Sequence, residues 1–561
     1  MAEELMQDEE FQKERKIAKE AREKKDIKKM VSHEEPVNEE SMHWADVVAR
    51  RVIHEKGDKE KYVVAAGITP SGVVHIGNFR EIITVDLVAR ALRKLGKKVR
   101  FIYSWDDYDV FRKVPKGMPR PEMLEKHLRM PIVDVPDPFG CHTSYAEHHE
   151  KAVEESILLA GIEPEFIQQN RMYRECRYAE QIREAMRARQ KIREVLDRFR
   201  AEELTKDWLP ISAFCPKCKK DEVKISEYDE EYSVRIKCKC GYDEKVDFRN
   251  CGFVKLPWRV DWPMRWHYEK VDFEPGGKDH STAGGSRDTG AGIIQAVWNE
   301  EAPVYQMYDF LSVKGRGGKI SSSLGNVITL QAVLDVYEPE IVRYLFCGTR
   351  PNREFAISFD LDVIKIYSDF DRVEQAYYGL LEIEDKKKLT QMKRTYELCA
   401  IGKIPEKMPF QPSFRHLLNI IQICEGDLEE AQKYFGKDIK DETDKKRFMA
   451  RAERAKTWLE HFAPEEFRFK VQQAVPVGLN LTVKQREALQ KSAFMLKEWK
   501  GMDDKKLHDE FYKIFNALGL KPNEFFEAAY SVLINKKRGP QLASFVLAIG
   551  KEKVADLFDM V

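Results

Sequence analysis

The sequence predicts an α/β protein in which a Rossmann-like parallel sheet, interrupted by an insertion, precedes an all-α C-terminal region. Three observations support this fold class. A strand–helix–strand pattern covers about residues 62–103, two close pairs of cysteines lie in a segment without that pattern, and amphipathic helical patterns dominate beyond residue 340. A strand–helix–strand unit makes its two strands parallel and places ligands at their carboxyl ends.

The strand–helix–strand unit starts with the apolar run Tyr62–Ala66, which is typical of a short buried strand. A loop rich in Gly, Pro and Ser follows. Apolar residues then recur at helical spacing from Ile76 until Gly96, a residue that suits a helix end, and Val99–Tyr103 forms the next strand. The loop between the first strand and the helix should therefore lie at the ligand-binding edge of the sheet.

The insertion is predicted to cover residues 135–255 and to contain a long charged helix near 178–206. Four of its cysteines form two close pairs: Cys215, Cys218, Cys238 and Cys240. In a cytosolic protein such pairs indicate metal ligands rather than disulfides. Four thiolates predict a closed, structural zinc site, and the apolar residues between the pairs predict a hairpin.

A second group of metal-ligand side chains lies within twelve residues: Asp137, Cys141, His142 and His148. Zinc accepts all of these donor types. From their spacing alone, however, loose histidines and cysteines near a loop are more often not a site.

Composition limits the possible functions. The 561 residues hold 95 basic and 95 acidic side chains, which excludes a wholly basic nucleic-acid coat but not a local nucleic-acid surface. No apolar run reaches the roughly 18 residues of a membrane span, and the charged start lacks a secretory signal, so we expect a cytoplasmic protein. Residues 1–40 are polar on every face and are interpreted as a frayed extension or, alternatively, a basic arm that contacts a nucleic acid.

Two segments have the composition of a phosphate-binding site. The first starts the predicted helix and contains Pro70, Gly72, His75, Gly77 and Asn78. Backbone N–H groups at a helix start attract phosphate, although a lone His there is more often a simple cap. The second is a glycine-rich basic loop with Lys319 followed by Ser321, Ser322 and Ser323. Its cation and hydroxyls suit a triphosphate, whereas a flexible surface loop is the alternative.

Together these segments resemble the HIGH and KMSKS motifs of class I aminoacyl-tRNA synthetases, in the right order and 244 positions apart from His75 to Lys319. The match departs from the motifs at Asn78, where a second His is common, and at Ser322, where a second Lys is common. The loss of that Lys puts part of the transition-state stabilisation in doubt, and Lys319, Lys314 or Arg316 can compensate. A third segment, with Gly277, Asp279 and His280, resembles the stretch that holds adenosine and amino acid, although a capped turn is the alternative.

Other segments resemble the lysine-specific members of this family, among them 104–115, 257–266 and 284–290. The resemblance covers about residues 60–560. It implies ATP-dependent ligation of lysine to tRNA(Lys), with Mg²⁺ on the pyrophosphate, catalytic roles for His75, Asn78 and Lys319, and a second zinc at the 137–148 cluster. It also implies a set of lysine-binding residues: Gly67, Thr69, Trp258, His280 and Tyr308.

The resemblance also sets the expected domain organisation, for a chain that we expect to be monomeric. The divisions are an N-terminal extension (1–40), two catalytic halves (41–134 and 256–335) around the zinc-bearing insertion (135–255), a stem-contact region (336–410) and a helical anticodon-binding domain (411–561). Two alternatives stay open. One is a class I synthetase for another amino acid, glutamate being the nearest, and the other is a non-catalytic tRNA-binding paralogue.

Overall fold

The structure is a computed structural model that describes residues 43–282, 284–314, 327–498, 500–501 and 503–561. Its core is a parallel sheet of β1 (Lys61–Ile68), β2 (Lys98–Trp105) and β3 (Glu165–Gln168), with β2 in the middle. Single parallel bridges extend it on the other side of β1, from Val64 to Phe273 and from Phe273 to Val304. This order is that of a Rossmann sheet, whose switch point, where ligands bind, lies beside β1.

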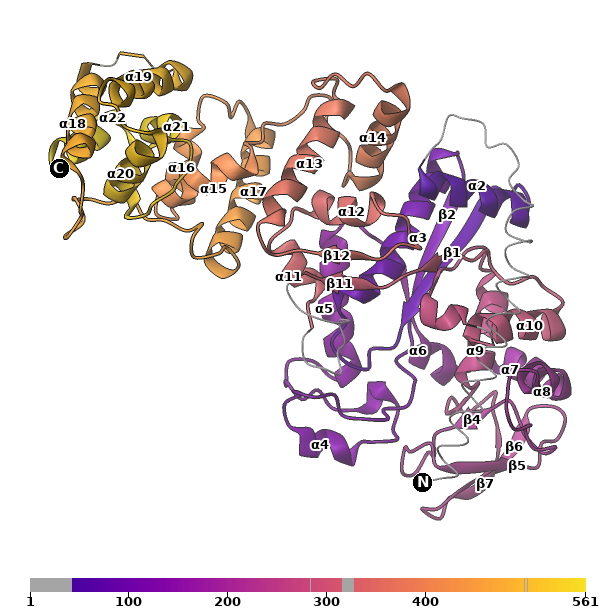
Figure 1. Ribbon diagram of the computed structural model, residues 1–561. Coiled ribbons are helices and arrows are strands. Elements are labelled where there is room, and N and C mark those ends of the chain that lie inside the picture. The colour runs from indigo at the N-terminus through magenta and orange to yellow at the C-terminus, as the bar shows by residue number, and fades with distance from the viewer. Residues whose placement is uncertain (1–42, 283, 315–326, 499, 502) are drawn as a thin grey trace, which may run out of the picture.

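Helices cover both faces of the sheet (Figure 1). Alternate residues of β1 point to opposite faces, as the strand geometry requires. Tyr62, Val64 and Ala66 pack in the core formed with α2 (Trp44–Lys56) and α3 (Ile76–Lys94). Val63 and Ala65 pack against the other face, where α9 (Trp258–Glu269) and α10 (Ser286–Trp298) lie. Burial on both faces explains why the strand is an uninterrupted apolar run.

The insertion differs from its prediction in two respects. The third strand of the sheet, β3, lies inside the range 135–255, so part of the predicted insertion belongs to the sheet itself. The expected long helix near 178–206 is divided into α7 (Ala179–Arg187) and α8 (Arg189–Asp197), with the break at Ala188. Between β2 and β3 the chain forms α4 (Pro121–Lys126), a 3-10 turn (Ile132–Asp134) and α5 (Tyr145–Leu159), and α6 (Gln169–Arg174) follows β3.

The cysteine-rich part of the insertion is an antiparallel ribbon of β5 (Val223–Ser226), β6 (Ser233–Cys238) and β7 (Asp243–Asp247). The hairpin expected between the cysteine pairs is confirmed, since Ile225 lies opposite Ile236. The two ends of the ribbon are joined where β4 (Ser212–Ala213) pairs with β8 (Val254–Lys255), which leads directly into α9. The ribbon is therefore attached close to the carboxyl ends of the sheet strands.

Two pairs of short parallel strands form in the chain after α9. β9 (Gly276–Gly277) pairs with β10 (Met307–Tyr308), and β11 (Leu311–Val313) pairs with β12 (Phe355–Ile357). The 3-10 turn Lys278–Ser281 follows β9. The predicted loop residues Lys319, Ser321, Ser322 and Ser323 lie outside the described residues, as does the extension 1–40.

The C-terminal region is all helical and projects from the sheet body as an arm (Figure 1). Helices packed on the body come first: α11 (Leu330–Leu334), α12 (Pro339–Cys347), α13 (Asp362–Tyr377) and α14 (Lys386–Cys399). A middle group follows: α15 (Phe414–Ile423), α16 (Leu428–Tyr434) and α17 (Glu442–His461). The last group has its own apolar core: α18 (Val483–Glu498), α19 (Asp504–Ala517), α20 (Pro522–Ile534), α21 (Leu542–Ile549) and α22 (Lys551–Asp559).

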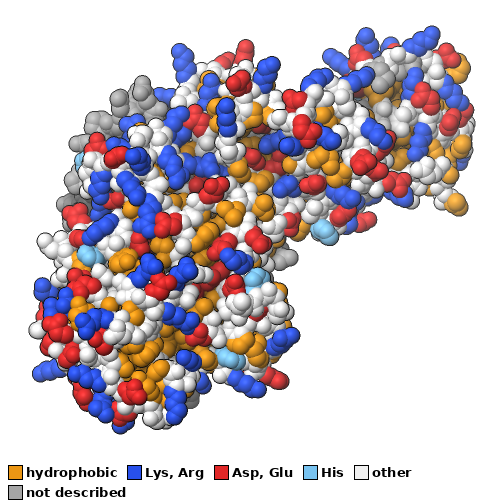
Figure 2. Space-filling model, turned by 180° about the vertical axis from the view of Figure 1, so that it is seen from behind, with side chains coloured by type: hydrophobic (Ala, Val, Ile, Leu, Met, Phe, Trp, Pro, Cys, Tyr) orange, Lys and Arg blue, Asp and Glu red, His pale blue; other side chains and the backbone are white. Residues whose placement is uncertain are grey.

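A buried ionic cluster joins the first two helix groups. Arg451 on α17 bonds Glu338 at 2.8 Å and Asp371 on α13 at 2.8 Å, and both Arg451 and Glu338 are almost completely buried. Breaking such a pair would leave an uncompensated buried charge. On the face shown in Figure 2, basic and acidic side chains are interspersed over body and arm. Within the described part of the chain, no helix is long and apolar enough to cross a membrane.

Candidate active site

The first predicted phosphate-binding segment connects β1 to α3. At its start, a Cβ on Gly67 would lie 2.9 Å from the Ser104 carbonyl oxygen, so only glycine lets the ends of β1 and β2 approach this closely. At its end, a Cβ on Gly77 would lie 2.8 Å from the His75 ring, so Gly77 makes room for that ring over the helix start. A Cβ on Gly72, in contrast, would make only ordinary contacts.

Asn78 caps the helix. Its side-chain oxygen accepts a hydrogen bond from the His75 backbone N–H at 3.1 Å, which leaves its NH2 group as the part that can donate to a ligand. The Asn that replaces the common second His therefore keeps a donor at the helix start. Pro70 is buried at the beginning of the same segment.

Helix α3 also bonds described residues that flank the glycine-rich loop on both sides in the sequence. The Ile76 N–H donates to the Ile328 carbonyl at 2.8 Å, just after the loop. The Arg80 guanidinium donates to the carbonyls of Asp309 and Phe310 at 2.9 and 2.8 Å, just before it. Lys314, which was expected as a possible substitute cation, instead pairs with Asp360 at 3.3 Å and with Asp362.

A cavity of about 430 Å³ opens at the carboxyl end of β1. It brings together residues of both predicted sets: Gly67, Thr69, Trp258, His280 and Tyr308 with Gly72, His75 and Asn78. Trp258 stacks on Trp262 with ring centroids 5.3 Å apart, and the Arg265 guanidinium lies over its ring. Gly277 packs against the Tyr308 ring, and Asp279 is exposed on the turn that carries His280.

Three carboxylates line this cavity: Glu81, Asp106 and Asp109. Asp106 and Asp109 belong to the segment 104–115 that resembles the lysine-specific family, but none of the three was predicted as a site residue. Two are neutralised by cations, since Asp106 bonds Arg265 at 2.6 Å and Asp109 bonds Lys255 at 2.8 Å. In the described part of the chain, Glu81 forms no ion pair and accepts only from neutral groups, the Gly67 N–H at 3.0 Å and the Tyr308 hydroxyl at 2.6 Å. Glu81 is thus the carboxylate with charge to offer a ligand.

The environment of Glu81 changes its ionisation. Burial raises the pKa of Glu81 to about 7, helped by the nearby Glu274 and Asp106 carboxylates and opposed by the two hydrogen bonds. A cation bound in the cavity would favour its ionised form. A sequence signal existed, because Glu81 lies one helical turn after Asn78 and so shares its face of α3.

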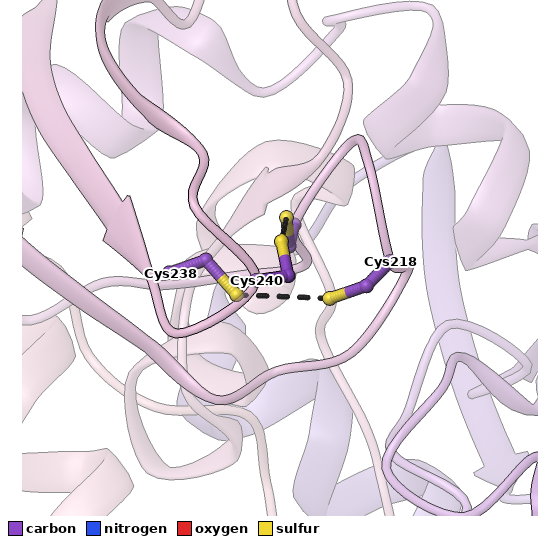
Figure 3. Close-up of side chains that lie close together, drawn as sticks. Cys218, Cys238 and Cys240 are labelled. Atoms are coloured by element: carbon purple, nitrogen blue, oxygen red, sulfur yellow. Dashed lines mark hydrogen bonds between the residues drawn. The ribbon is translucent and has the colours of Figure 1, made fainter.

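The four ribbon cysteines converge. The sulfur atoms of Cys215 and Cys240 are 3.5 Å apart, those of Cys218 and Cys238 are 3.6 Å apart, and all four lie within 4.8 Å of one another. Figure 3 shows Cys218 and Cys238 pointing at each other with Cys240 beside them. Bonds of about 2.3 Å to a tetrahedral zinc place sulfurs about 3.8 Å apart, so the cluster fits that ion.

The second metal-ligand group also converges. The Cys141 sulfur lies 3.1 Å from His142 Nδ1, 3.2 Å from His148 Nδ1 and 3.4 Å from Asp137. Burial opposes ionisation of Asp137, but the backbone N–H groups that bond it outweigh burial and lower its pKa to about 2. His149, which follows His148 in the sequence, is not part of this group and packs edge-on against Tyr145.

Comparisons with known proteins identify the class. A family model described as tRNA synthetases class I (K) matches residues 42–402, and the chain belongs to this family. Proteins named lysine--tRNA ligase are similar over nearly their whole length. The one from Borrelia garinii subsp. bavariensis is 47% identical over 91% of this chain and 98% of its own. Those from Treponema pallidum and Thermococcus kodakarensis are 43% and 42% identical, over 92% and 91% of this chain and 98% of each relative.

Among solved structures, a glutamate tRNA ligase from Elizabethkingia meningosepticum in complex with its amino acid matches with a TM-score of 0.44 and 14% identity, over 89% of this chain and 98% of that one.

Proposed function

We propose that this protein is a lysine--tRNA ligase that uses ATP to attach lysine to tRNA(Lys). The observation that carries the choice of amino acid is Glu81. A lysine side chain brings an ammonium group, and Glu81 with the Tyr308 hydroxyl offers it two acceptor groups at one end of the cavity. The Trp258 ring lines the same cavity and would pack along the substrate side chain. The relatives that align with more than nine tenths of this chain are named lysine--tRNA ligase.

The same residues argue against glutamate. A glutamate side chain would meet the Glu81 carboxylate without a cation to neutralise either charge, because Arg265 and Lys255 are already paired with Asp106 and Asp109. Like charges at short range cost several kcal/mol in a partly buried site, of the order of 4 kcal/mol at 4 Å with an effective dielectric of about 20. The cavity therefore selects a cationic side chain.

In the first step, an oxygen of the lysine carboxylate attacks the α-phosphorus of ATP and pyrophosphate leaves. No general base is needed because the carboxylate is already ionised. Catalysis is positioning and charge stabilisation, with His75, Asn78 and the start of α3 facing the phosphates. We assign the corresponding cationic role to Lys319 and hydroxyl roles to Ser321, Ser322 and Ser323, and Mg²⁺ would neutralise the pyrophosphate.

In the second step, the 2′-hydroxyl of the terminal tRNA ribose attacks the carbonyl carbon of lysyl-adenylate. The new C–O ester bond forms, the bond from carbon to the phosphate oxygen breaks, and AMP leaves with that electron pair and takes up the hydroxyl proton. We propose that this reaction takes place in the cytoplasm and that a single chain performs it.

We propose that the C-terminal helices, 411–561, bind the anticodon. A cavity of about 470 Å³ lies where α15 meets α21 and the end of α20. The side chains of Arg415 and Arg538 at this cavity have neither a hydrogen-bond nor an ion-pair partner among the described residues. Unpaired cations beside an apolar floor that includes Phe469 and Phe545 suit unstacked nucleotides.

We propose two zinc ions per chain. Cys215, Cys218, Cys238 and Cys240 would hold the first, and since four thiolates leave no open position, that ion is structural. Asp137, Cys141, His142 and His148 would hold the second, next to the start of α5, which packs beside the phosphate-binding segment through the bond from the Tyr145 hydroxyl to the Ser71 carbonyl.

Pyrophosphate exchange with each of the twenty amino acids, with and without tRNA, tests the proposal. Exchange with lysine alone supports it. Exchange with glutamate instead would keep the family and overturn the pocket, and no exchange under any condition, with tight tRNA binding, would favour a non-catalytic paralogue.

A further inference from the structure

A small cavity of about 100 Å³ adjoins the phosphate-binding segment. Lysine and ATP do not use it in the mechanism above. Five residues line both this cavity and the amino-acid cavity: Val73, Val74, His75, Asn78 and Tyr103. These residues separate the two spaces, so a group in the small cavity can act on His75 without occupying the place of either substrate.

Three helices enclose the small cavity, and most of what they contribute is apolar. α3 begins at the phosphate-binding segment, and α11 begins two residues after Ile328, whose carbonyl accepts from the Ile76 N–H. α5 packs against α11. The apolar lining residues are Phe79, Ile82, Val153, Ile157 and Leu330. A polar side chain among them therefore has few groups with which to bond.

His149 on α5 is such a side chain. It is 3% exposed, and within the described part of the chain its Nε2 atom is buried without a hydrogen-bond partner. An unpaired polar atom in a protein interior is costly, and an ordered water molecule is a common partner for one in a native structure. The position of His149 on the lining of the cavity suggests where such a water molecule binds.

The cavity has the room and the polar groups that a water molecule requires. One water molecule needs about 10–15 Å³ of cavity volume and about two to four polar partners. Besides His149, the lining supplies the His75 ring and the Asn78 NH2 group. An imidazole nitrogen donates or accepts according to its tautomer, and water does both, so a water molecule can connect His149 to His75 in either arrangement.

The position of His149 is fixed by its neighbours. Its ring packs edge-on against Tyr145, with centroids 4.6 Å apart, and against His148, with centroids 5.1 Å apart. The Tyr145 hydroxyl donates to the Ser71 carbonyl at 3.1 Å, and His148 belongs to the second metal-ligand group. The first turns of α5 are therefore tied to the phosphate-binding segment, and the His149 imidazole is held beside it.

We infer that His149 is a positioning residue for His75. A hydrogen bond through one water molecule in the small cavity holds the His75 ring in the orientation that donates to the phosphates of ATP. His149 does not line the amino-acid cavity, so it contacts neither substrate. The inference rests on the proposed function, in which His75 stabilises charge that develops as lysine attacks the α-phosphorus. Because this charge belongs to the transition state, misorientation of His75 should lower kcat rather than raise KM.

Lysine-dependent pyrophosphate exchange tests this inference in four proteins: the wild type, His149→Leu, His149→Gln and Ile157→Val. The Leu side chain fills the space without a polar atom, whereas Gln keeps an amide group that can bond the same water molecule. Ile157→Val is the matched control, because Ile157 lies on the same helix, lines the same cavity and is 1% exposed. Thermal melting and zinc content are measured for each protein.

His149→Leu should lower kcat about tenfold, which corresponds to about 1.4 kcal/mol and to the loss of one hydrogen bond. KM for ATP and KM for lysine should stay within about twofold of the wild type. His149→Gln should keep kcat within about threefold. Ile157→Val should melt at a slightly lower temperature because it leaves a small void, and it should keep both kcat and KM.

A double-mutant cycle separates a role through His75 from a general effect on the fold. In the background of His75→Asn, adding His149→Leu should slow single-turnover formation of lysyl-adenylate by less than about twofold. A further tenfold loss in that background would overturn the inference, as would wild-type exchange in His149→Leu. A loss of exchange together with a loss of zinc would assign the effect to the metal-ligand group and would also overturn it. Failure of the proposed function has a different signature, since the wild type itself would then show no lysine-dependent exchange.

Discussion

Replacing Glu81 by Gln tests the lysine pocket at the residue on which it depends most. The carboxylate accepts from the Gly67 N–H and the Tyr308 hydroxyl and is the acceptor proposed for the substrate ammonium. A Gln side chain keeps an oxygen for the Gly67 N–H and can donate its NH2 group to the Tyr308 hydroxyl oxygen, so it keeps both local hydrogen bonds but loses the charge and one acceptor. A hydrogen bond to a charged group contributes about 1.5–3 kcal/mol, so lysine should bind about 10- to 150-fold more weakly.

The wild-type protein should show the same dependence as a pH effect. Because the pKa of Glu81 is raised to about 7, the carboxylate loses its charge as the pH falls through that value. The substrate ammonium stays protonated throughout this range. Lysine affinity should therefore be about tenfold weaker at pH 6 than at pH 8, because the carboxylate is about one tenth ionised one pH unit below its pKa and about nine tenths ionised one unit above it.

Calorimetric titration with lysine between pH 6 and pH 8.5 measures both effects. In Glu81→Gln the pH dependence should disappear along with the affinity. Glu163→Gln, an exposed carboxylate with no partner among the described residues, is the matched control and should leave both unchanged. A Glu81→Gln protein that binds lysine within twofold of wild type, or keeps its pH profile, would refute the role given to Glu81.

The other predictions concern the phosphate and metal sites. Asn78→Asp keeps the acceptor for the His75 N–H and should keep the stability of the protein. Because it replaces a donor by an anion beside the phosphates, it should lower pyrophosphate exchange about a hundredfold. Asn78→Ala also removes the helix cap, so urea unfolding should show a further loss of stability of about 1 kcal/mol. Lys319→Ala should abolish lysine-dependent exchange without changing the melting temperature, and near wild-type exchange would remove its role. Metal analysis should find two zinc ions per chain, one after Cys218→Ser and one after Cys141→Ser; a single ion in the wild type would remove the site at 137–148.

Elements with strong periodicity could be predicted from the sequence. The apolar run of β1, the helical spacing of α3 and the strand β2 were predicted to within a few residues, because both faces of this unit are buried. The strand β3 was missed because it has only four residues and none of them is buried. The break at Ala188 between α7 and α8 carries neither Gly nor Pro, so no local signal marks it.

The residues of the candidate site also divide into those that the sequence predicts and those that it misses. The motif residues around His75 and the cysteine pairs have fixed spacings and can be found in the sequence, whereas Glu81 looks like any charged residue of a helix until Tyr308 is placed beside it. Tyr305 and Tyr308 illustrate the limit. The cavity is lined by Tyr308, while the Tyr305 hydroxyl bonds Ser281 at 2.7 Å, and which of the two faces the ligand depends on the pairing of β9 with β10.

The most direct test of the central claim is charging of two modified tRNA(Lys) molecules, one ending in 2′-deoxyadenosine and one in 3′-deoxyadenosine, with radioactive lysine or glutamate. We predict that lysine is attached to the 3′-deoxy form and not to the 2′-deoxy form, and that glutamate is attached to neither. Charging with glutamate would contradict the lysine pocket, and charging of the 2′-deoxy form would contradict the assigned attack by the 2′-hydroxyl.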